Sequence, residues 1–277
     1  IELFKNNNKH LFFMKKKNFL SRSVKFFREF FRKVKILNKG NYFVTEKNSY
    51  VDDGLAANHI FDFMKDEKFI NSYNEGKKTG GLLGHTGDIH YRAYIACYFA
   101  KLCLKLEGDF VECGVGKGLL SKTIVEYLNF KNVNKNFYLF DTYEGIPIEQ
   151  IEQAIEDEKD TLKYMKLKFS GNYYNEVLKT FSNHENVKII KGTIPQIFNT
   201  IKINKVSYFS VDMNNSYAEM ESIKFFWDKI VNHGIILLDD YAYSDDFKVQ
   251  KKSWDKFASE KNIEILTLPT GQGLIIK

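Results

Sequence analysis

The chain has 277 residues, of which 44% are hydrophobic and 16% aromatic, and its formal net charge is +6. This length and apolar content suffice for one large packed domain with an appendage. The composition argues against a membrane-spanning chain, since no stretch approaches the roughly 20 apolar residues that cross a bilayer. The three cysteines lack metal-site spacing, which argues against a cysteine metal centre or a disulfide scaffold, and we expect a cytoplasmic protein.

Residues 1–40 form a basic segment in which phenylalanines are interspersed among lysines and arginines. Several exposed phenylalanines together would form an apolar patch that soluble proteins rarely tolerate. We therefore expect a helical N-terminal extension that docks on the domain or on a second subunit, and a homo-oligomer is predicted on this ground. Peripheral contact with an anionic membrane is the alternative for this segment, and nucleic acid is not expected as a partner.

Residues 41–90 are mixed and polar, with glycines clustered near residue 80 that indicate a mobile segment. The domain boundary is expected there, with an N-terminal extension or lid over 1–80 and the main domain over 81–277. A helix is then expected over 91–106, because apolar residues recur at helical spacing and a glycine follows the pattern.

The most informative motif begins at the end of the predicted strand 110–113. It places an acid and three glycines at alternate positions, Glu112, Gly114, Gly116 and Gly118. Glycine lets the backbone turn sharply and approach a ligand that a Cβ would block. The spacing differs from the G-x-G-x-x-G of dinucleotide sites and resembles the first motif of class I S-adenosylmethionine (SAM) methyltransferases, whose cofactor carries a ribose but no phosphate. A tight turn without a ligand is the alternative.

Strand and helix patterns alternate from this motif to the end of the chain. Apolar runs typical of strands lie at 110–113, 137–140, 187–190, 206–211, 235–238, 263–268 and 274–276. Helical patterns lie at 119–129, 173–182, 217–231 and 246–260. This alternation predicts an α/β fold with a doubly wound, mostly parallel sheet. Seven strands after a glycine-rich turn match the Rossmann-like class I methyltransferase sheet, whose last strand is antiparallel.

A second acid, Asp141, ends the second predicted strand and is followed by Thr142. In doubly wound sheets, ligands bind beyond the carboxyl ends of the strands near the point where the strand order reverses. We therefore expect Asp141 and Thr142 to contact the cofactor, with Asp141 on the ribose hydroxyls. The alternative is that Asp141 caps the turn that follows it.

Three more acids follow the fourth and fifth predicted strands, which are neighbours in this sheet order. Asp212 ends the fourth strand, and Asp239 and Asp240 end the fifth. Three carboxylates this close repel one another and take up protons unless a cation neutralises them. Oxygen ligands favour Mg²⁺, or else Ca²⁺, and Asn214 could add a further oxygen. The alternative is that these acids cap the helices that follow.

A metal at this edge would bind a vicinal diol of an acceptor and lower the pKa of the hydroxyl group. A nearby general base would then take the proton. The candidates are Asp212, Asp239 and His90, which precedes the first strand. Arg92 is a candidate partner for the carboxylate of SAM or for an anionic acceptor.

Four motifs in this order together resemble the macrocin O-methyltransferase family, whose members are SAM-dependent and methylate sugar hydroxyls, often with Mg²⁺. The motifs lie at 110–118, 140–147, 211–214 and 234–241, and the resemblance covers roughly residues 80–277. It implies that Asp212, Asp239 and Asp240 are metal ligands and that Glu112, Gly114 and Asp141 contact SAM. The chain departs from the better-known members at Asn214, where they carry a second aspartate.

The sequence therefore predicts a SAM-dependent O-methyltransferase that acts on a sugar hydroxyl with help from Mg²⁺. The acceptor is expected to be a glycan, a nucleotide sugar or a glycosylated metabolite. One alternative is a metal-dependent glycosyltransferase that uses Asp212 and Asn214 as a degenerate Asp-x-Asp motif. The other is a non-enzymatic scaffold that associates with membranes or nucleic acid through the basic N-terminal segment.

Overall fold

The computed structural model describes residues 35–36, 43–44, 50–82 and 87–277. The chain divides into two compact units, residues 1–61 and 62–277. In the smaller unit, β1 (Lys35–Ile36) pairs antiparallel with β2 (Phe43–Val44), and β3 (Tyr50–Asp52) pairs antiparallel with β4 (Leu55–Ala57). The extension was expected to be helical, whereas its described residues 35–36 and 43–44 are strands. Residues 1–34 and part of the glycine segment, 83–86, lie outside the described residues.

The larger unit begins nearer the N-terminus than the boundary predicted at residue 80, because α2 (Glu67–Lys77) packs against α4 (Leu119–Leu128). Asp66 starts α2 by accepting hydrogen bonds from the next turn's amides, and the helix buries Phe69 and Tyr73. The helices approach so closely that a Cβ on Gly76 would lie 2.1 Å from the hydroxyl oxygen of Thr123.

The larger unit contains a seven-stranded sheet in the order β10-β11-β9-β8-β5-β6-β7. The strands are β5 (Asp109–Cys113), β6 (Phe137–Asp141), β7 (Val187–Lys191), β8 (Val206–Val211), β9 (Ile230–Leu238), β10 (Leu266–Thr267) and β11 (Gly273–Ile276). The β5–β6, β6–β7, β5–β8 and β8–β9 pairs are parallel, and β11 is antiparallel to β9. The predicted mostly parallel sheet with its antiparallel last strand is confirmed.

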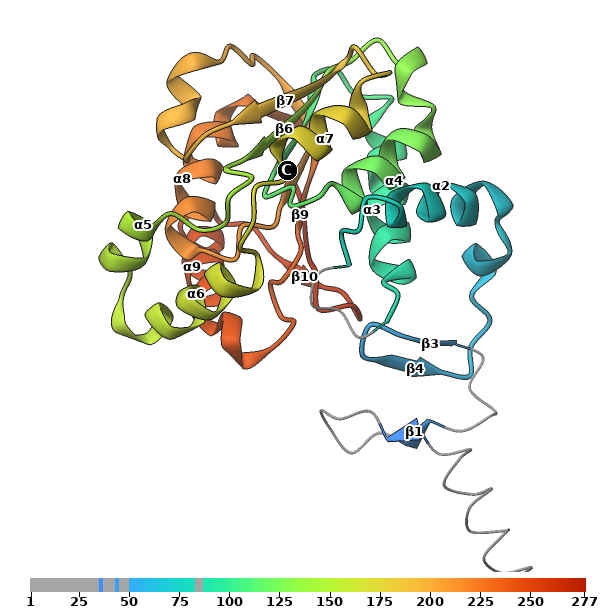
Figure 1. Ribbon diagram of the computed structural model, residues 1–277, viewed down its shortest axis with the longest axis horizontal. Helices are drawn as coiled ribbons and strands as arrows, with labels where there is room; N and C mark the ends of the chain where they lie inside the picture. The colour runs from blue at the N-terminus through green and yellow to red at the C-terminus, as the bar shows by residue number, and fades with distance from the viewer. Residues whose placement is uncertain (1–34, 37–42, 45–49, 83–86) are drawn as a thin grey trace, which may run out of the picture. The chain divides into compact units, whose positions relative to one another are not determined.

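Helices cover both faces of this sheet, with α3 and α4 on one side and α8 and α9 on the other (Figure 1). The main helices after α2 are α3 (His90–Cys103), α4, α7 (Tyr174–Phe181), α8 (Ser216–Phe226) and α9 (Lys248–Lys261). Short 3₁₀ helices lie at η1 (Asp62–Lys65), η2 (Phe130–Asn132), η3 (Gln196–Thr200), η4 (Trp227–Lys229) and η5 (Asp245–Phe247). None of the described helices is both long and apolar enough to cross a membrane.

Successive side chains of β5 alternate between the two cores, as the pleat of a strand requires. Phe110 packs among aromatic rings that include Phe130 and Tyr208. Val111 and Cys113 belong to the apolar cluster on the other face. Both faces of the strand are therefore buried, which explains its continuous apolar pattern.

Several predicted boundaries differ from the structure. The helix predicted over 217–231 ends at Phe226, and β9 already begins at Ile230, five residues before the predicted strand. His233 takes a left-handed conformation inside β9, with φ of 62°, and the pairing of β8 with β9 shifts register nearby. This irregularity interrupts the apolar pattern that marks a strand. The strand predicted over 263–268 shortens to β10.

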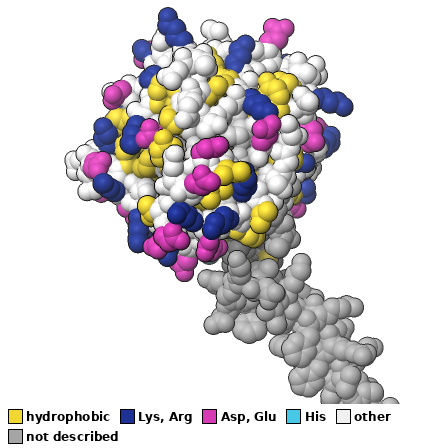
Figure 2. All heavy atoms as spheres, turned by 60° about the vertical axis from the view of Figure 1, so that its left-hand side comes forward, with side chains coloured by type: hydrophobic (Ala, Val, Ile, Leu, Met, Phe, Trp, Pro, Cys, Tyr) yellow, Lys and Arg dark blue, Asp and Glu magenta, His cyan; other side chains and the backbone are white. Residues whose placement is uncertain are grey.

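An insertion after β6 forms two helices that the sequence analysis did not predict, α5 (Ile148–Gln153) and α6 (Glu156–Lys168). They pack on Phe247 through a small apolar cluster that includes Leu162 and Met165. The outer surface of the insertion carries exposed apolar side chains, Ile148, Ile155, Tyr164 and Leu167. Figure 2 shows that lysines and acidic residues are interspersed with apolar side chains over the face that it presents.

Candidate active site

The structure brings three acids together at the carboxyl ends of β8 and β9. The last residues of these parallel strands, Val211 and Leu238, are paired, so the following residues, Asp212 and Asp239, lie side by side. The amide of Asp239 donates to the carbonyl oxygen of Val211 at 2.9 Å. One carboxylate oxygen from each of Asp212, Asp239 and Asp240 lies within 4.8 Å of the others. We call these three residues the acid cluster.

A buried arginine, Arg92, faces the acid cluster. The guanidinium nitrogen Nη1 of Arg92 lies 2.7 Å from Oδ2 of Asp239 and 3.4 Å from Oδ1 of Asp240. The other nitrogen, Nη2, donates to the carbonyl oxygen of Thr270 at 3.0 Å. Arg92 is 1% exposed, so its guanidinium interacts with protein groups and not with solvent. This geometry differs from the predicted contact between Arg92 and the carboxylate of SAM, because the guanidinium is turned toward the acids.

The electrostatics of the acid cluster favour a bound proton or cation. Burial raises the pKa of the Asp212 carboxyl well above its usual value, and the neighbouring Asp239 and Asp240 charges raise it further. The positive charge of Arg92 opposes this shift. Among the described residues, the guanidinium of Arg92 is the cation that contacts these carboxylates, and carboxylates packed this closely raise one another's pKa.

The glycine turn lies at the carboxyl end of β5, beside the acid cluster. A Cβ on Gly114 would lie 1.8 Å from the carbonyl oxygen of Asp212. A side chain at position 114 would therefore clash with the adjacent backbone. The sequence analysis had instead expected glycine here because a ligand approaches. A Cβ on Gly116 would meet nothing within 4 Å, although its φ of +54° still favours glycine. Gly118 packs against the ring of Phe181.

Asp141 ties the glycine turn to the end of β6. Its Oδ2 accepts hydrogen bonds from the amides of Val115 at 2.7 Å and Gly116 at 2.8 Å. Its Oδ1 accepts from the amide of Tyr143 at 2.6 Å, which is the capping role that the sequence analysis held as the alternative. Thr142 also serves this turn, since its hydroxyl donates to the carbonyl oxygen of Gly145 at 2.6 Å.

Glu112 is buried in β5 with half of its carboxyl group unpaired. Its Oε1 accepts a hydrogen bond from the hydroxyl of Ser121 in α4 at 2.8 Å, whereas Oε2 has no partner among the described residues. Burial raises the pKa of Glu112 to about 8, and the charges of Asp239 and Asp141 contribute to the rise. An orphaned buried oxygen is costly in a native structure and points to a missing partner.

The structure does not bring His90 into the acid cluster, which contains no histidine among the described residues. The ring of His90 lies 4.2 Å from that of Tyr73 in α2, measured between centroids. His90 and Arg92 are two residues apart in α3, and side chains at this spacing point to nearly opposite sides of a helix. Since Arg92 points to the acids, His90 points to α2.

Sequence reasoning missed the polar residues that support the acid cluster. Gln272 donates from Nε2 to Oδ1 of Asp239 at 2.9 Å, and the sequence analysis assigned Gln272 no role. Glu158 of α6 accepts hydrogen bonds from both the amide and the hydroxyl of Ser216, close to Asp212 in the chain. The available signal for Gln272 was a polar side chain next to the apolar last strand, residues 273–276.

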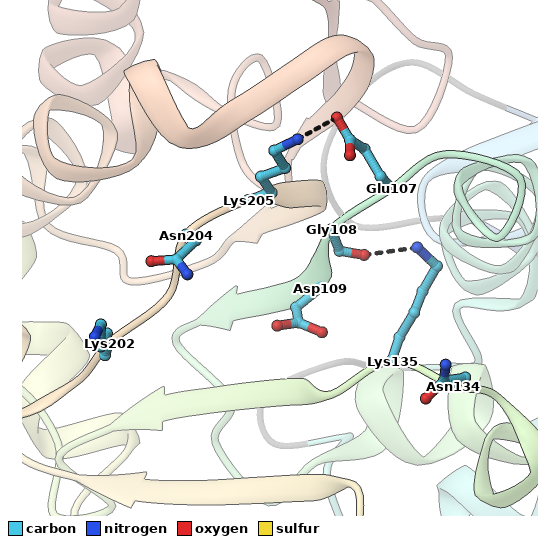
Figure 3. Close-up of a pocket in the computed structure, with 8 residues that line it drawn as sticks. All are labelled: Glu107, Gly108, Asp109, Asn134, Lys135, Lys202, Asn204 and Lys205. Atoms are coloured by element: carbon cyan, nitrogen blue, oxygen red, sulfur yellow. Dashed lines mark hydrogen bonds and ion pairs between the residues drawn. The ribbon is translucent and has the colours of Figure 1, made fainter.

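A separate pocket of about 490 Å³ lies at the opposite edge of the sheet, by the amino ends of β5 and β8. Lys205 pairs with Glu107 at 2.6 Å, and Lys135 donates to the carbonyl oxygen of Gly108 at 2.6 Å (Figure 3). This pocket contains none of the predicted site residues. Ligands of open parallel sheets bind at the carboxyl edge, so the acid cluster and glycine turn define the candidate site.

The fold and this site define a class I, SAM-dependent O-methyltransferase. A family model for macrocin-O-methyltransferase (TylF) matches residues 93–267 of the chain. The chain therefore belongs to the macrocin-O-methyltransferase family, and the resemblance predicted from the four motifs is confirmed. No curated protein sequence shows significant similarity to the chain.

Solved structures share the fold at low sequence identity. The O-methyltransferase NovP has a TM-score of 0.58 and 17% identity, over 67% of this chain and 79% of its own. The calicheamicin methyltransferase CalS11 has a TM-score of 0.54 and 11% identity, over 73% and 91% of the two chains. Cofactor-bound Rv0187 from MTB has a TM-score of 0.52 and 10% identity, over 78% and 93%.

Proposed function

We propose that the protein transfers the methyl group of SAM to a sugar hydroxyl, in a glycan, a nucleotide sugar or a glycosylated metabolite, with the assistance of Mg²⁺. The observation that carries this proposal is the acid cluster, which lies beside the glycine turn at the carboxyl edge of the sheet. Membership in the macrocin-O-methyltransferase family supports the sugar acceptor. The neighbour CalS11 is itself a calicheamicin methyltransferase.

The residues around the glycine turn fit SAM. Glu112 offers a buried oxygen that no described residue pairs with, and the space beside Gly116 is open. We infer that these residues contact the cofactor, together with Gly114, Gly118, Asp141 and Thr142 at the same edge. Bound SAM would supply the electrophilic methyl group. The role of the chain is to bind the cofactor and to exclude water from the transfer.

The donor set of the acid cluster fits a hard divalent cation. Three carboxylate oxygens within 4.8 Å of one another match the oxygen ligands that Mg²⁺ prefers. Asn214 faces the cluster with its amide nitrogen, which donates to Oδ1 of Asp212 at 3.2 Å. We infer that Asp212, Asp239 and Asp240 hold this ion, which would lower the pKa of the acceptor hydroxyl.

We assign the removal of the hydroxyl proton to Asp212. Both oxygens of Asp239 accept hydrogen bonds or ion-pair contacts, from Arg92 and from Gln272. Burial and the neighbouring acidic charges raise the pKa of Asp212, which makes its carboxylate a stronger base than an exposed one.

A methyl-transfer assay tests the proposal. The purified chain is incubated with SAM and a panel of free, nucleotide-linked and glycosidic sugars, and S-adenosylhomocysteine (SAH) is measured. We expect acceptor-dependent SAH formation that falls after exhaustive chelation and returns with Mg²⁺. Full activity after chelation would contradict the metal role. Binding of UDP-sugars without binding of SAM would favour the glycosyltransferase alternative.

We also propose a cellular location and binding partners for the protein. The cysteines of the chain, Cys97, Cys103 and Cys113, are all buried and free of disulfides, which supports the cytoplasm as its location. We also infer that residues 1–40 dock on the domain or on a second copy in a homo-oligomer, with an anionic membrane as the competing partner. A truncated chain tests this, since loss of binding to anionic liposomes without a change in size or melting temperature would favour the membrane.

A further inference from the structure

Resting on the proposed metal site, we propose that Arg92 and Gln272 are positioning residues for Asp239. They orient its carboxylate toward the cation before the cation binds. Arg92 comes from α3, and Gln272 comes from the turn between β10 and β11. Both residues lie outside residues 93–267, which the family model matches.

Arg92 is bound at both ends of its fork. Nη1 donates to the backbone oxygen of Asp239 at 2.7 Å and lies 2.7 Å from the side-chain Oδ2 of the same residue. Nη2 reaches the carbonyl oxygen of Thr270 at 3.0 Å. The planar fork of arginine can bridge these two segments at once, whereas the single ammonium of lysine cannot reproduce that geometry.

The residue type supports this geometric role. Of the 41 lysines and arginines in the sequence, only Arg22, Arg28, Arg32 and Arg92 are arginines. Arg92 is thus the only arginine in the part of the chain that the structure describes, where all other basic side chains apart from histidine are lysines. The ring of Tyr243 lies 5.0 Å from the Cζ of Arg92, which further restricts the guanidinium.

Gln272 holds the other carboxylate oxygen of Asp239. Gln272 is fully buried, and its Oε1 accepts a hydrogen bond from the hydroxyl of Thr270 at 2.9 Å. This bond orients the amide so that Nε2 faces Oδ1 of Asp239, at 2.9 Å. The carboxylate therefore cannot rotate without the loss of at least one contact.

This arrangement leaves Asp239 able to bind a cation. A carboxylate offers about four lone-pair sites on its two oxygens, and the contacts with Arg92 and Gln272 leave sites available. Hydrogen-bond partners of this kind orient metal ligands, and their loss typically weakens metal affinity. The acid cluster is therefore assembled in the protein before the cation arrives.

The decisive experiment compares two buried glutamines that each donate to a carboxylate. Gln272 donates to Asp239 in the acid cluster, and Gln250 donates to Glu219 at 2.7 Å between α9 and α8. The variants Gln272→Met and Gln250→Met each remove one such bond. Mn²⁺ affinity of the full chain is measured by electron paramagnetic resonance, with SAH affinity as a check on folding.

We expect Gln272→Met to weaken Mn²⁺ binding by about 10- to 100-fold while SAH still binds, and Gln250→Met to leave Mn²⁺ affinity unchanged. Equal Mn²⁺ affinity in wild type and Gln272→Met would overturn the inference. A wild-type protein that binds SAH but no Mn²⁺ would instead overturn the proposed metal role, and the inference with it.

Arg92→Lys provides a second test, which keeps the positive charge. It tests the positioning of Asp239 even if Gln272→Met does not fold. We expect weaker Mn²⁺ binding, because lysine cannot bridge Asp239 and Thr270. Tighter Mn²⁺ binding in Arg92→Lys would show that the guanidinium competes with the cation, and would overturn a positioning role.

Discussion

The two edges of the parallel sheet carry similar residue types in different physical settings. At the carboxyl edge, the acid cluster faces Arg92, whose side chain is 1% exposed. At the amino edge, Lys205 and Glu107 form an ion pair whose side chains are 54% and 64% exposed. Exposed pairs contribute little because water screens them, whereas buried charges strongly perturb one another. Burial at the correct edge identifies the functional site better than the presence of a pocket.

The exchange of Asp239 for Asn, at the carboxyl edge, should have the largest effect on activity. The amide keeps the shape of the side chain but removes the charge that meets Arg92 and the proposed cation. We expect kcat with a sugar acceptor to fall about 1000-fold, equivalent to roughly 4 kcal/mol of transition-state stabilisation. Glu107→Gln at the amino edge is the control and should retain activity. Equal activity in both variants would remove the functional distinction between the edges.

The glycine turn gives the next largest effect. Gly114→Ala should destabilise the fold by about 4 kcal/mol or more, because its Cβ would overlap the backbone oxygen of Asp212. The Cβ added by Gly116→Ala would meet no atom within 4 Å. This substitution should lower the free energy of unfolding by only about 1 kcal/mol, through backbone strain. Gly116→Ala should mainly weaken the binding of SAH, whose affinity we expect to fall about tenfold.

Urea unfolding and calorimetry measure these two quantities. A Gly114→Ala protein as stable as wild type would contradict the observed approach of β5 to Asp212. Normal SAH affinity in Gly116→Ala would place the cofactor elsewhere.

Glu112 predicts a dependence of stability on pH. Its pKa is raised to about 8 in the folded protein from an ordinary value of 4.5. The folded state therefore holds this proton more tightly than the unfolded state, so stability is lost as the pH rises from 4.5 toward 8. Glu112→Gln should reduce this loss by a few kcal/mol, on the order expected for a shift of several pKa units.

The measurement is the free energy of unfolding at pH 5 and pH 9 without divalent cations. Glu107→Gln, which is exposed, should keep the wild-type pH dependence. An identical pH dependence in wild type and Glu112→Gln would show that Glu112 ionises normally.

The smallest effect is expected at the amino edge. Lys205→Gln breaks the exposed pair with Glu107 and should change the free energy of unfolding by less than about 0.5 kcal/mol. Methyl transfer should be unchanged, as measured under the conditions used for Asp239→Asn. A strong loss of activity would show that the pocket at this edge takes part in function.

The sequence by itself determined the order of the elements and the glycine turn, because apolar periodicity and turn chemistry are local properties. It also placed Asp212 and Asp239 at neighbouring strand ends, since parallel strands align their carboxyl ends. It did not predict α5 and α6, whose apolar side chains are partly buried and partly exposed and so do not form a one-sided core pattern, and it placed the start of β9 too late.

Only the tertiary structure decided which partners the site residues have. Arg92 and Gln272 are 180 positions apart in the chain and meet at Asp239 through α3 and the last hairpin. Local sequence patterns contain no information about contacts between residues so far apart in the chain. The same holds for Glu112, whose burial against α4 leaves one oxygen unpaired. Its raised pKa results from the removal of water by packing, which depends on the whole fold.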